Sequence, residues 1–278
     1  MRRMKLRLSW MVFLALAGYS PSSFGQADDP IPTAIRKSGE IRVAAASSPP
    51  YLVVSPTGEA TGYDADIINL ALKGMGLPAM KALLLANDAL IPALQAHQVD
   101  LVAPDLGYTE ARCKAVVFTG PVYASQDGVY VPIGNPKHLT GYSSVAQSQD
   151  VKLAVVRGSL QEAFALKQGV KPEQLVRVTD IAAGIATIRG GRANAFALGQ
   201  FTIPNPEQKS LEVVVDKQSP VNGVGVAFRM EDIRFRDAFD KQFDLLRSNG
   251  AMKEIYPFPN WDVLSKVHRA SELVPSCK

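Results

Sequence analysis

The strongest constraint in this sequence is an alternation of short apolar strands with amphipathic helices, which occurs in two separate blocks. A strand, a helix and a second strand in succession predict a right-handed crossover between parallel strands, so each block is expected to form a mainly parallel sheet flanked by helices. The candidate strands are 41–46, 81–86 and 99–103 in the first block, and 151–156, 193–198 and 211–215 in the second.

Aspartates and glycines mark the ends of the predicted helices. An Asp side chain accepts hydrogen bonds from the free N–H groups of a first helical turn, and glycine is favoured just after a last turn. The aspartates expected to begin helices are Asp66, Asp88 and Asp180. Helices are also expected over 160–168, before Gly169, and over 231–248, where Phe235, Phe239, Phe243 and Leu246 share one face.

Two segments are expected to connect the blocks, so the chain would cross twice between two lobes. The first connection is an extended segment over 124–132, and the return is 218–223, followed by a strand over 224–228. A pair of crossings makes a hinge about which lobes can close on a ligand. The predicted organisation is a signal peptide (1–27), a first lobe (28–124 and 223–278) and a second lobe (125–222).

The first residues have the three-part pattern of a secretory signal peptide. Basic residues precede an apolar run over 8–17, and small residues follow around Gly25 and Ala27, where cleavage is expected. The apolar run is short for a bilayer, which takes about 20 residues; an N-terminal membrane anchor is the alternative. We therefore expect the mature protein in the periplasm.

The charge balance gives no reason to expect a nucleic-acid partner. The chain has 30 Lys+Arg and 26 Asp+Glu. Residues 1–27 contain four basic residues and no acidic residue, so the remainder carries 26 of each. Because this remainder is neutral, we expect no nucleic-acid partner, and because it lacks a second long apolar run, we expect a soluble protein. A monomer is also expected.

Cysteines and histidines argue for a disulfide and against a metal site. Cys113 and Cys277 are the only cysteines. In an oxidising compartment such a pair usually forms one bridge; the alternative is a buried thiol beside an exposed one. His97, His138 and His268 are far apart in the sequence and match no zinc-ligand spacing, so no metal or cofactor is expected.

Several short sequences resemble those of the periplasmic polar amino-acid-binding proteins, which are family 3 of the solute-binding proteins. They are GYDADI at 62–67, ALIPAL at 89–94, TEAR at 109–112, VFTGPVY at 117–123 and VVRGS at 155–159. The resemblance extends over nearly all of 40–257. It implies an α/β fold of the type II periplasmic-binding-protein class, with a ligand cleft between two lobes, and delivery of the ligand to the membrane permease of an ABC transporter.

The resemblance also implies which residues bind ligand. Arg112 occupies the position at which the family holds a ligand carboxylate, and a guanidinium suits that role because it can donate two hydrogen bonds to two oxygens. Ser159 lies where a strand meets a helix N-terminus, which favours an anion; capping of that helix needs the same hydroxyl. For Thr109, capping the short helix that carries Arg112 is favoured over ligand contact.

Two aspartates that bind the ligand ammonium in such proteins are missing here. The segments at 45–51 and 194–200 contain no acidic residue. An ammonium buried without an anionic partner is costly. The ligand therefore lacks an α-ammonium, or another acid replaces the pair, and Asp105 is the obvious replacement. Asp105 could instead pair with Arg112, and both roles remain open.

Polar and aromatic candidates complete the predicted site. Asn87 stands where relatives place an aromatic residue against the ligand, so a hydrogen-bonding contact is expected there. Tyr51 is the nearest remaining aromatic, although it could simply pack the strand end, and Gln200 could exchange a hydrogen bond with ligand. These residues predict a polar ligand with a carboxylate, such as a non-standard amino acid, a hydroxy acid or a related organic acid.

Two other classes of function share this fold. A cyclohexadienyl-dehydratase-like enzyme would need a positioned acid or base, for which Asp105 or Glu162 could serve, although nothing marks either residue. A free-standing accessory protein of a periplasmic enzyme is the third hypothesis. The sequence lacks the G-x-S-x-G motif of nucleophilic hydrolases, and the binding protein is the preferred interpretation.

Overall fold

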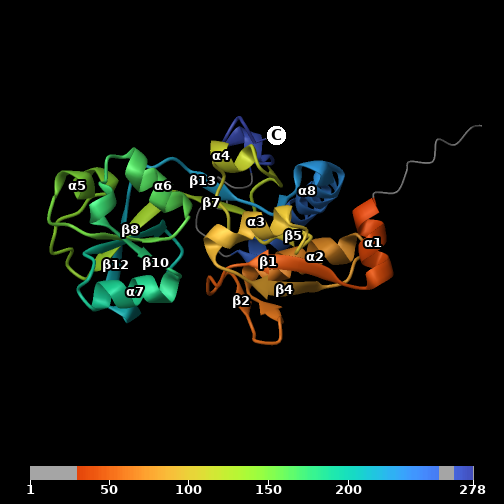
Figure 1. Cartoon of the computed structure of the whole chain (residues 1–278), viewed down its shortest axis with the longest axis horizontal. Helices are drawn as coiled ribbons and strands as arrows, with labels where there is room; N and C mark the ends of the chain where they lie inside the picture. The colour runs from red at the N-terminus through yellow and green to blue at the C-terminus, as the bar shows by residue number, and fades with distance from the viewer. Residues whose placement is uncertain (1–29, 257–265, 278) are drawn as a thin grey trace, which may run out of the picture.

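The computed structural model describes residues 30–256 and 266–277, which form two lobes, each with a five-stranded sheet (Figure 1). The sheet of lobe 1 has the order β4-β1-β5-β14-β6. Its strands are β1 (Ile41–Ala45), β4 (Met80–Leu84), β5 (Leu101–Val102), β6 (Val117–Phe118) and β14 (Ala227–Phe228). A small hairpin of β2 (Val53–Val54) and β3 (Ala60–Thr61) lies beside β4.

The sheet of lobe 2 has the order β10-β9-β11-β8-β12, which is the same topology. Its strands are β8 (Asp127–Pro132), β9 (Leu153–Val156), β10 (Leu175–Val178), β11 (Ala195–Gly199) and β12 (Leu211–Val215). In both lobes four strands run in one direction, and the strand that enters just after a crossing inserts antiparallel between two of them. The predicted α/β two-lobe class is confirmed, with sheets that are mixed rather than purely parallel.

Helices cover both sheets, and their apolar faces form the cores. Phe235 and Phe239 of α8 pack with Phe228 of β14, and Phe243 packs with Phe239; all four rings are almost completely buried. The other helix bounds are α1 (Pro30–Ser38), α2 (Tyr63–Gly74), α3 (Leu90–Gln95), α4 (Glu110–Cys113), α5 (Tyr142–Gln147), α6 (Leu160–Lys167), α7 (Ile181–Arg189), α8 (Ile233–Ser248) and α9 (Ala251–Ile255).

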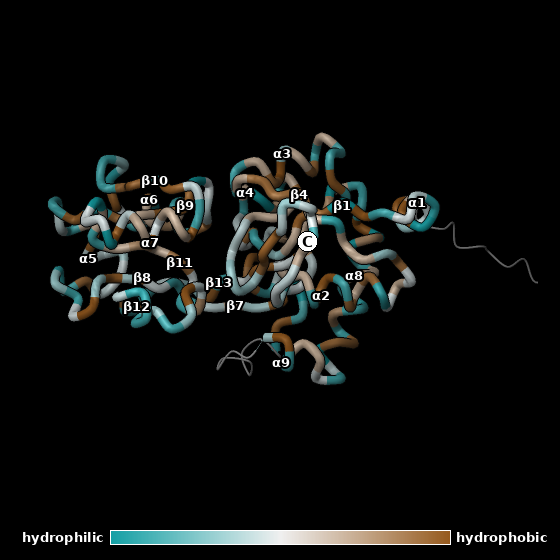
Figure 2. The backbone as a smooth tube through the Cα atoms, turned by 90° about the horizontal axis from the view of Figure 1, so that it is seen from below, coloured by the Kyte–Doolittle hydropathy of each residue, from teal (hydrophilic) through white to brown (hydrophobic). Residues whose placement is uncertain are grey.

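Two short antiparallel strands join the lobes. They are β7 (Tyr123–Ser125) and β13 (Asn222–Val224), and they lie between the lobes in both views (Figures 1 and 2). Gly223 of β13 pairs with Ala124 of β7, so the two crossings are hydrogen-bonded to each other. The two predicted connections overlap this pair of strands.

Three predictions about elements were wrong. Segment 124–132 is not a connector throughout, because Asp127–Pro132 is a strand of the lobe 2 sheet and its apolar residues are buried on both sides. Asp88 makes no cap: α3 begins after a 3₁₀ turn, without a side-chain cap. The helix predicted from Asp66 begins earlier, at Tyr63, because Gly62 supplies the φ of 104° that turns the chain into it.

Other local predictions hold. The Asp180 side chain accepts a hydrogen bond from the backbone N–H of Ala183 and caps α7. The predicted strand 211–215 has the observed bounds, whereas 224–228 divides between β13 and β14. The predicted signal peptide and its cleavage site lie outside the described residues. Within the described ranges, no helix has both the length and the apolar character needed to span a bilayer.

Candidate ligand-binding site

A cleft of about 390 Å³ lies between the lobes beside the hinge strands. Both lobes and the hinge contribute to its walls, as expected for sheets that present their strand ends to each other. The polar and aromatic residues that line it are Ser47, Ser48, Tyr51, Asn87 and Asp105 from lobe 1, Tyr123, Ser125 and Asn222 from the hinge, and Asp127, Ser159, Gln161, Thr179, Asp180 and Thr202 from lobe 2.

The charge of this lining is one-sided. Among the described residues, the charged side chains that line the cleft are three aspartates, Asp105, Asp127 and Asp180, with no lysine, arginine or histidine. Asp180 lies at the start of α7, where the backbone N–H of Ala183 partly compensates its charge. The other two come from opposite lobes and define the electrostatic character of the site.

Asp105 follows β5 and is held by lobe 1 donors. Its Oδ2 accepts from the backbone N–H of Ala46 at 2.9 Å, and its Oδ1 accepts from the hydroxyl of Ser48 at 3.0 Å. Burial raises the pKa of Asp105 to about 6, although these two hydrogen bonds favour the charged form. At neutral pH the carboxylate is therefore mainly ionised in an environment that penalises its charge.

Asp127 is the first residue of β8 and is only 1% exposed. Its Oδ1 accepts from the side-chain amide of Gln161 at 2.8 Å, and its Oδ2 accepts from the hydroxyl of Tyr142 at 2.9 Å. Burial is the largest cause that raises the pKa of Asp127. None of the ion pairs of the described residues includes Asp127 or Asp105. Among these residues, each carboxylate therefore lacks a countercharge.

Aromatic rings form one wall of the cleft. Tyr51 and Tyr123 lie with ring centroids 5.0 Å apart, and Tyr51 is 2% exposed. The hydroxyl of Tyr51 donates to the carbonyl of Phe201 in lobe 2 at 3.0 Å, so this residue both lines the cleft and joins the lobes. The faces of such rings attract cations.

The structure brings four of the predicted site residues to the cleft: Tyr51, Asn87, Asp105 and Ser159. The buried Nδ2 of Asn87 has no hydrogen-bond partner in the described protein, so a donor is available at this wall. Ser159 caps α6 by accepting from the backbone N–H of Glu162 at 3.1 Å. Its hydroxyl hydrogen is left to donate elsewhere.

Three predicted residues are not among those that line the cleft: Thr109, Arg112 and Gln200. Thr109 caps α4, as favoured above, by accepting from the backbone N–H of Arg112 at 3.1 Å. The carbonyl of Gln200 accepts from the hydroxyl of Tyr130 within lobe 2. Arg112 donates to two backbone carbonyls and, among the described residues, makes no ion pair with Asp105, which was one of the two roles left open for that carboxylate.

Sequence reasoning missed Asp127 because its segment was interpreted as a connector. The available signal was an acidic residue directly next to an apolar run: Asp127 precedes such a run, whereas Asp105 follows one. The predicted Cys113–Cys277 disulfide is confirmed. In the described ranges, no group of three or more histidine, cysteine and acidic side chains has the arrangement of a metal site.

Comparisons with known proteins agree with the two-lobe fold. Residues 41–257 match the family model of bacterial extracellular solute-binding proteins, family 3. A probable amino-acid ABC transporter periplasmic-binding protein of Sinorhizobium fredii is 27% identical over 80% of this chain and 77% of its own length. The lysine/arginine/ornithine-binding periplasmic protein of Escherichia coli is 26% identical over 90% of this chain and 94% of its own length.

Solved structures add a likeness in three dimensions. The crystal structure of EhuB in complex with hydroxyectoine superposes with a TM-score of 0.80 at 28% identity, covering 88% of this chain and 97% of EhuB. The ancestral amino-acid-binding protein AncCDT-1, a precursor of cyclohexadienyl dehydratase, gives a TM-score of 0.73 at 22% identity over 82% of this chain and 98% of its own. At that identity the second likeness shows the fold alone.

Proposed function

Because this chain belongs to family 3 of the bacterial extracellular solute-binding proteins, we propose that it is the periplasmic binding component of an ABC uptake system and that its ligand is a small, amino-acid-like solute with a positive charge. The observation that carries the ligand class is the pair Asp105 and Asp127. They come from opposite lobes, line one cleft, and have no countercharge in the described protein.

A cationic group between these carboxylates supplies the missing charge. Burying an ionised carboxylate without a partner is unfavourable, and the free energy recovered when a cation arrives favours binding. The faces of Tyr51 and Tyr123 add attraction for the same charge. Relatives named for lysine, arginine, ornithine and histidine, and EhuB with hydroxyectoine, support a ligand of this kind.

The other end of an amino-acid-like ligand carries a carboxylate, and Ser159 is its proposed partner. Ser159 and the first turn of α6 line the cleft, and a helix N-terminus favours negative charge. The unpartnered amide nitrogen of Asn87 donates to a polar ligand oxygen. An acid with no cationic group is disfavoured, because three aspartates face it.

Closure follows from the division of these groups between lobes. Asp105, Asn87 and Tyr51 belong to lobe 1, whereas Asp127 and Ser159 belong to lobe 2. Only the closed arrangement brings both sets to one ligand, so ligand binding shifts the population toward it. The permease of the transporter then recognises the closed form. In this proposal the protein is a soluble periplasmic monomer that does not bind nucleic acid.

A catalytic role is the alternative, and Asp105 is the residue that would carry it. A carboxyl group with a pKa of about 6 is suited to acid–base chemistry near neutral pH. We propose instead that this group serves binding, as in the family's transport proteins. The test is incubation of the protein with prephenate or arogenate. Formation of the aromatic product, lost in D105N, would establish an enzyme.

Calorimetric titration of the protein lacking residues 1–27 tests the ligand class. The probes are L-arginine, L-lysine, L-histidine and hydroxyectoine, with glutarate as an anion that has no cationic group and glycerol as a neutral control. We expect binding only among the cationic and zwitterionic probes, and its loss in D127N. Tight binding of glutarate, retained in D127N, would refute the proposal.

A further inference from the structure

A small polar region lies where the cleft meets the hinge. Four of the residues that line the cleft contribute to it: Ser125 and Asn222 from the hinge strands, and Gly199 and Thr202 from lobe 2. We call these four residues the hinge subsite. The contacts proposed above for the cationic group and the carboxylate of the ligand use none of them.

Two cross-strand pairs bring this region together. Asn222 of β13 pairs directly with Ser125 of β7. In lobe 2, Gly199 of β11 pairs directly with Asp127 of β8. Side chains of directly opposed residues in antiparallel strands lie on the same face, with their Cβ atoms about 5 Å apart. Each pair therefore presents both of its members to the cleft.

The missing side chain of Gly199 leaves room for a ligand group. A Cβ on Gly199 would lie 3.1 Å from Oγ1 of Thr202 and 3.2 Å from Oγ of Ser125, so two hydroxyl oxygens lie around the space that a side chain would fill. Ser125 is only 8% exposed. No hydrogen bond among the described residues uses either hydroxyl, and both are therefore available to a ligand.

Asn222 supplies a donor to the hinge subsite. Its Nδ2 is buried and has no hydrogen-bond partner of good geometry among the described residues, although it lies near enough to Asp127 to favour the charged form of that carboxylate. A buried N–H without a partner is costly, and a ligand acceptor would recover that free energy. A ligand oxygen is therefore favoured here over a ligand N–H, which would meet Asn222 donor to donor.

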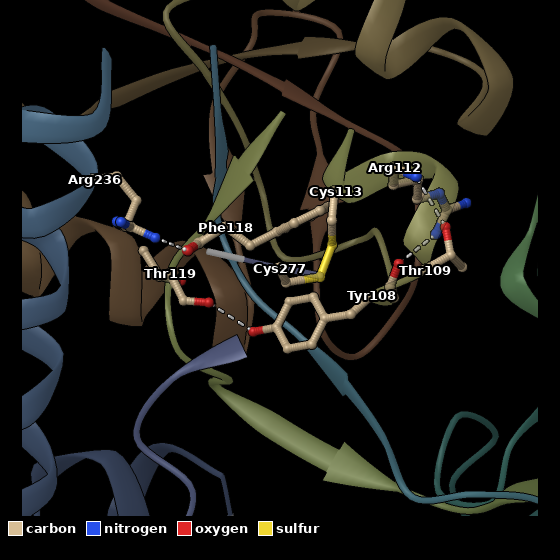
Figure 3. The surroundings of a disulfide bond; sticks show 9 residues. Tyr108, Thr109, Arg112, Cys113, Phe118, Thr119, Arg236 and Cys277 are labelled. Carbon is tan, nitrogen blue, oxygen red and sulfur yellow. Dashed lines mark hydrogen bonds between the residues drawn. A yellow bond between two sulfur atoms is a disulfide. The ribbon is translucent and has the colours of Figure 1, made fainter. Parts of the chain in front are cut away.

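The packing behind the hinge strand fixes the position of Asn222. Because side chains alternate along a strand, the Cβ position of the next residue, Gly223, points away from the cleft, and a Cβ there would lie 2.9 Å from Cε2 of Tyr108. The backbone N–H of Tyr108 donates to the carbonyl of Gly223 at 3.1 Å. Tyr108 in turn lies beside the Cys113–Cys277 disulfide in one core cluster (Figure 3). A donor held in place before the ligand arrives lowers the entropic cost of binding.

The charge of the surroundings narrows the ligand group to a hydroxyl. A carboxylate in the hinge subsite would lie beside Asp127 and be repelled by it. A hydroxyl accepts one hydrogen bond and donates another, so it can accept from Asn222 and donate to Asp127 or to a subsite hydroxyl. A carbonyl oxygen accepts only, and it cannot donate to Asp127.

We propose that the hinge subsite binds a hydroxyl group of the ligand, so that the preferred solutes are cations with a hydroxyl on the carbon next to the one that bears the cationic nitrogen. Asp127 then accepts from both groups, which is why they must lie close together. This inference rests on the proposed function, since it completes the same site, and it adds the hydroxyl to the ligand class.

Matched pairs of solutes test the inference. Hydroxyectoine and ectoine differ by one hydroxyl, as do 5-hydroxy-L-lysine and L-lysine. Calorimetric titration of the protein lacking residues 1–27 should give tighter binding of the hydroxylated member, by about tenfold for one hydrogen-bonded group. Equal binding of both members in each pair that binds would overturn the hinge subsite and leave the ligand class intact. If wild type binds neither pair, the ligand class itself fails, and the inference with it.

Substitution of Asn222 locates the effect. N222A removes the donor, so it should weaken binding of hydroxyectoine by about tenfold and leave that of ectoine nearly unchanged. N87A is the matched control, because it removes the other buried, unpartnered amide of the cleft, and it should weaken both solutes by the same factor. A general change in closure of the hinge would also weaken both equally. A ratio of affinities that survives in N222A would therefore overturn the subsite.

G199A tests the space itself. Its methyl group would enter the gap between the hydroxyls of Ser125 and Thr202, so the preference for the hydroxylated member should disappear while the other member still binds. The backbone of Gly199 lies outside the left-handed region, and alanine fits its conformation. Circular dichroism checks that the variant is folded. Full preference in folded G199A would show that the hydroxyl binds elsewhere.

Discussion

Lobe 1 and lobe 2 share one strand order, yet they present different chemistry to the space between them. The side chains of Tyr51 and Arg112 extend from lobe 1 and donate hydrogen bonds to lobe 2. Lobe 2 receives them with backbone carbonyls, at Phe201 and Gly158. The disulfide is confined to lobe 1, where it anchors the helix of Arg112.

This difference teaches that the lobes meet through main-chain acceptors of lobe 2, whereas the proposed recognition of charge uses an acidic side chain from each lobe. The hydrogen bonds of Tyr51 and Arg112 run from lobe 1 donors to main-chain carbonyls, which lobe 2 would present whatever its side chains. The proposed recognition uses one aspartate from each lobe, Asp105 and Asp127, which are held by different donors. Backbone and hydroxyl groups hold Asp105, whereas two side chains of lobe 2 hold Asp127.

The largest effect is expected from removing the disulfide, and it should fall on one lobe. The bridge spans 164 residues of sequence, for which the loop-closure relation gives about 5 kcal/mol and measured losses are about 2–5 kcal/mol. Hydrogen exchange of C113S/C277S should show weaker protection in β1 and β5 and unchanged protection in β9 and β11. Equal weakening in both lobes would remove this asymmetry.

The next largest effect is expected from the pair Asp105 and Asp127, whose substitution should weaken ligand binding whichever lobe is changed. D105N and D127N should each weaken binding of a cationic ligand by about 2–5 kcal/mol, the range for truncating one member of a buried charge pair. D127N should be the weaker binder because Asp127 is more buried. Calorimetry checks this, with D66N as the control at an exposed aspartate of α2. Wild-type affinity in either variant would assign recognition to one lobe.

The pH dependence of ligand affinity and of stability tests the role of Asp105. Burial raises the pKa of this residue to about 6. Below that pH the carboxyl is protonated, so cation affinity should fall, by at most about tenfold per pH unit for one proton. Stability without ligand runs the other way: the folded protein keeps a proton that the unfolded chain loses near pH 4, so the free energy of unfolding falls as pH rises from about 4 to 6.

Comparison of wild type with D105N separates the titration of Asp105 from that of other groups in the same pH range. One of these is Asp240, whose pKa is also raised to about 6. The affinity step near pH 6 should be absent in D105N, as should its share of the stability change. Calorimetric titrations and urea unfolding from pH 4.5 to 8 measure both. A step that persists in D105N would assign it to another group.

The smallest effect is expected where Gly107 of lobe 1 lies close to Leu160 of lobe 2. G107A adds a methyl group against Leu160, and we expect it to weaken ligand binding by about 1 kcal/mol, because the flexible end of Leu160 can partly move away. G107A/L160A should recover the part that is due to this contact. Titration of the same ligand into G107A, L160A and the double variant measures the coupling. Strict additivity would exclude steric contact between the lobes as the cause.

The candidate site was only partly predictable. Sequence patterns and family resemblance brought out Tyr51, Asn87, Asp105 and Ser159, which all line the cleft. They missed Asp127, because a residue at the start of a strand carries no local sign of the sheet it joins or of the lobe it faces. The predicted ligand role of Arg112 is untested, and the structure gives its donors two main-chain partners instead.

The sequence by itself determined the features that depend on near neighbours: the two strand–helix blocks, the caps at Thr109, Ser159 and Asp180, and the apolar face of α8. These follow from periodicity and hydrogen bonding within a few residues, so the chain carries them wherever it folds. Only the tertiary structure decided that β8 lies inside a sheet, that Asp105 and Asp127 share a cleft, and that Arg112 meets Gly158. Each joins segments far apart in sequence, and their meeting depends on how two packed lobes close about a hinge.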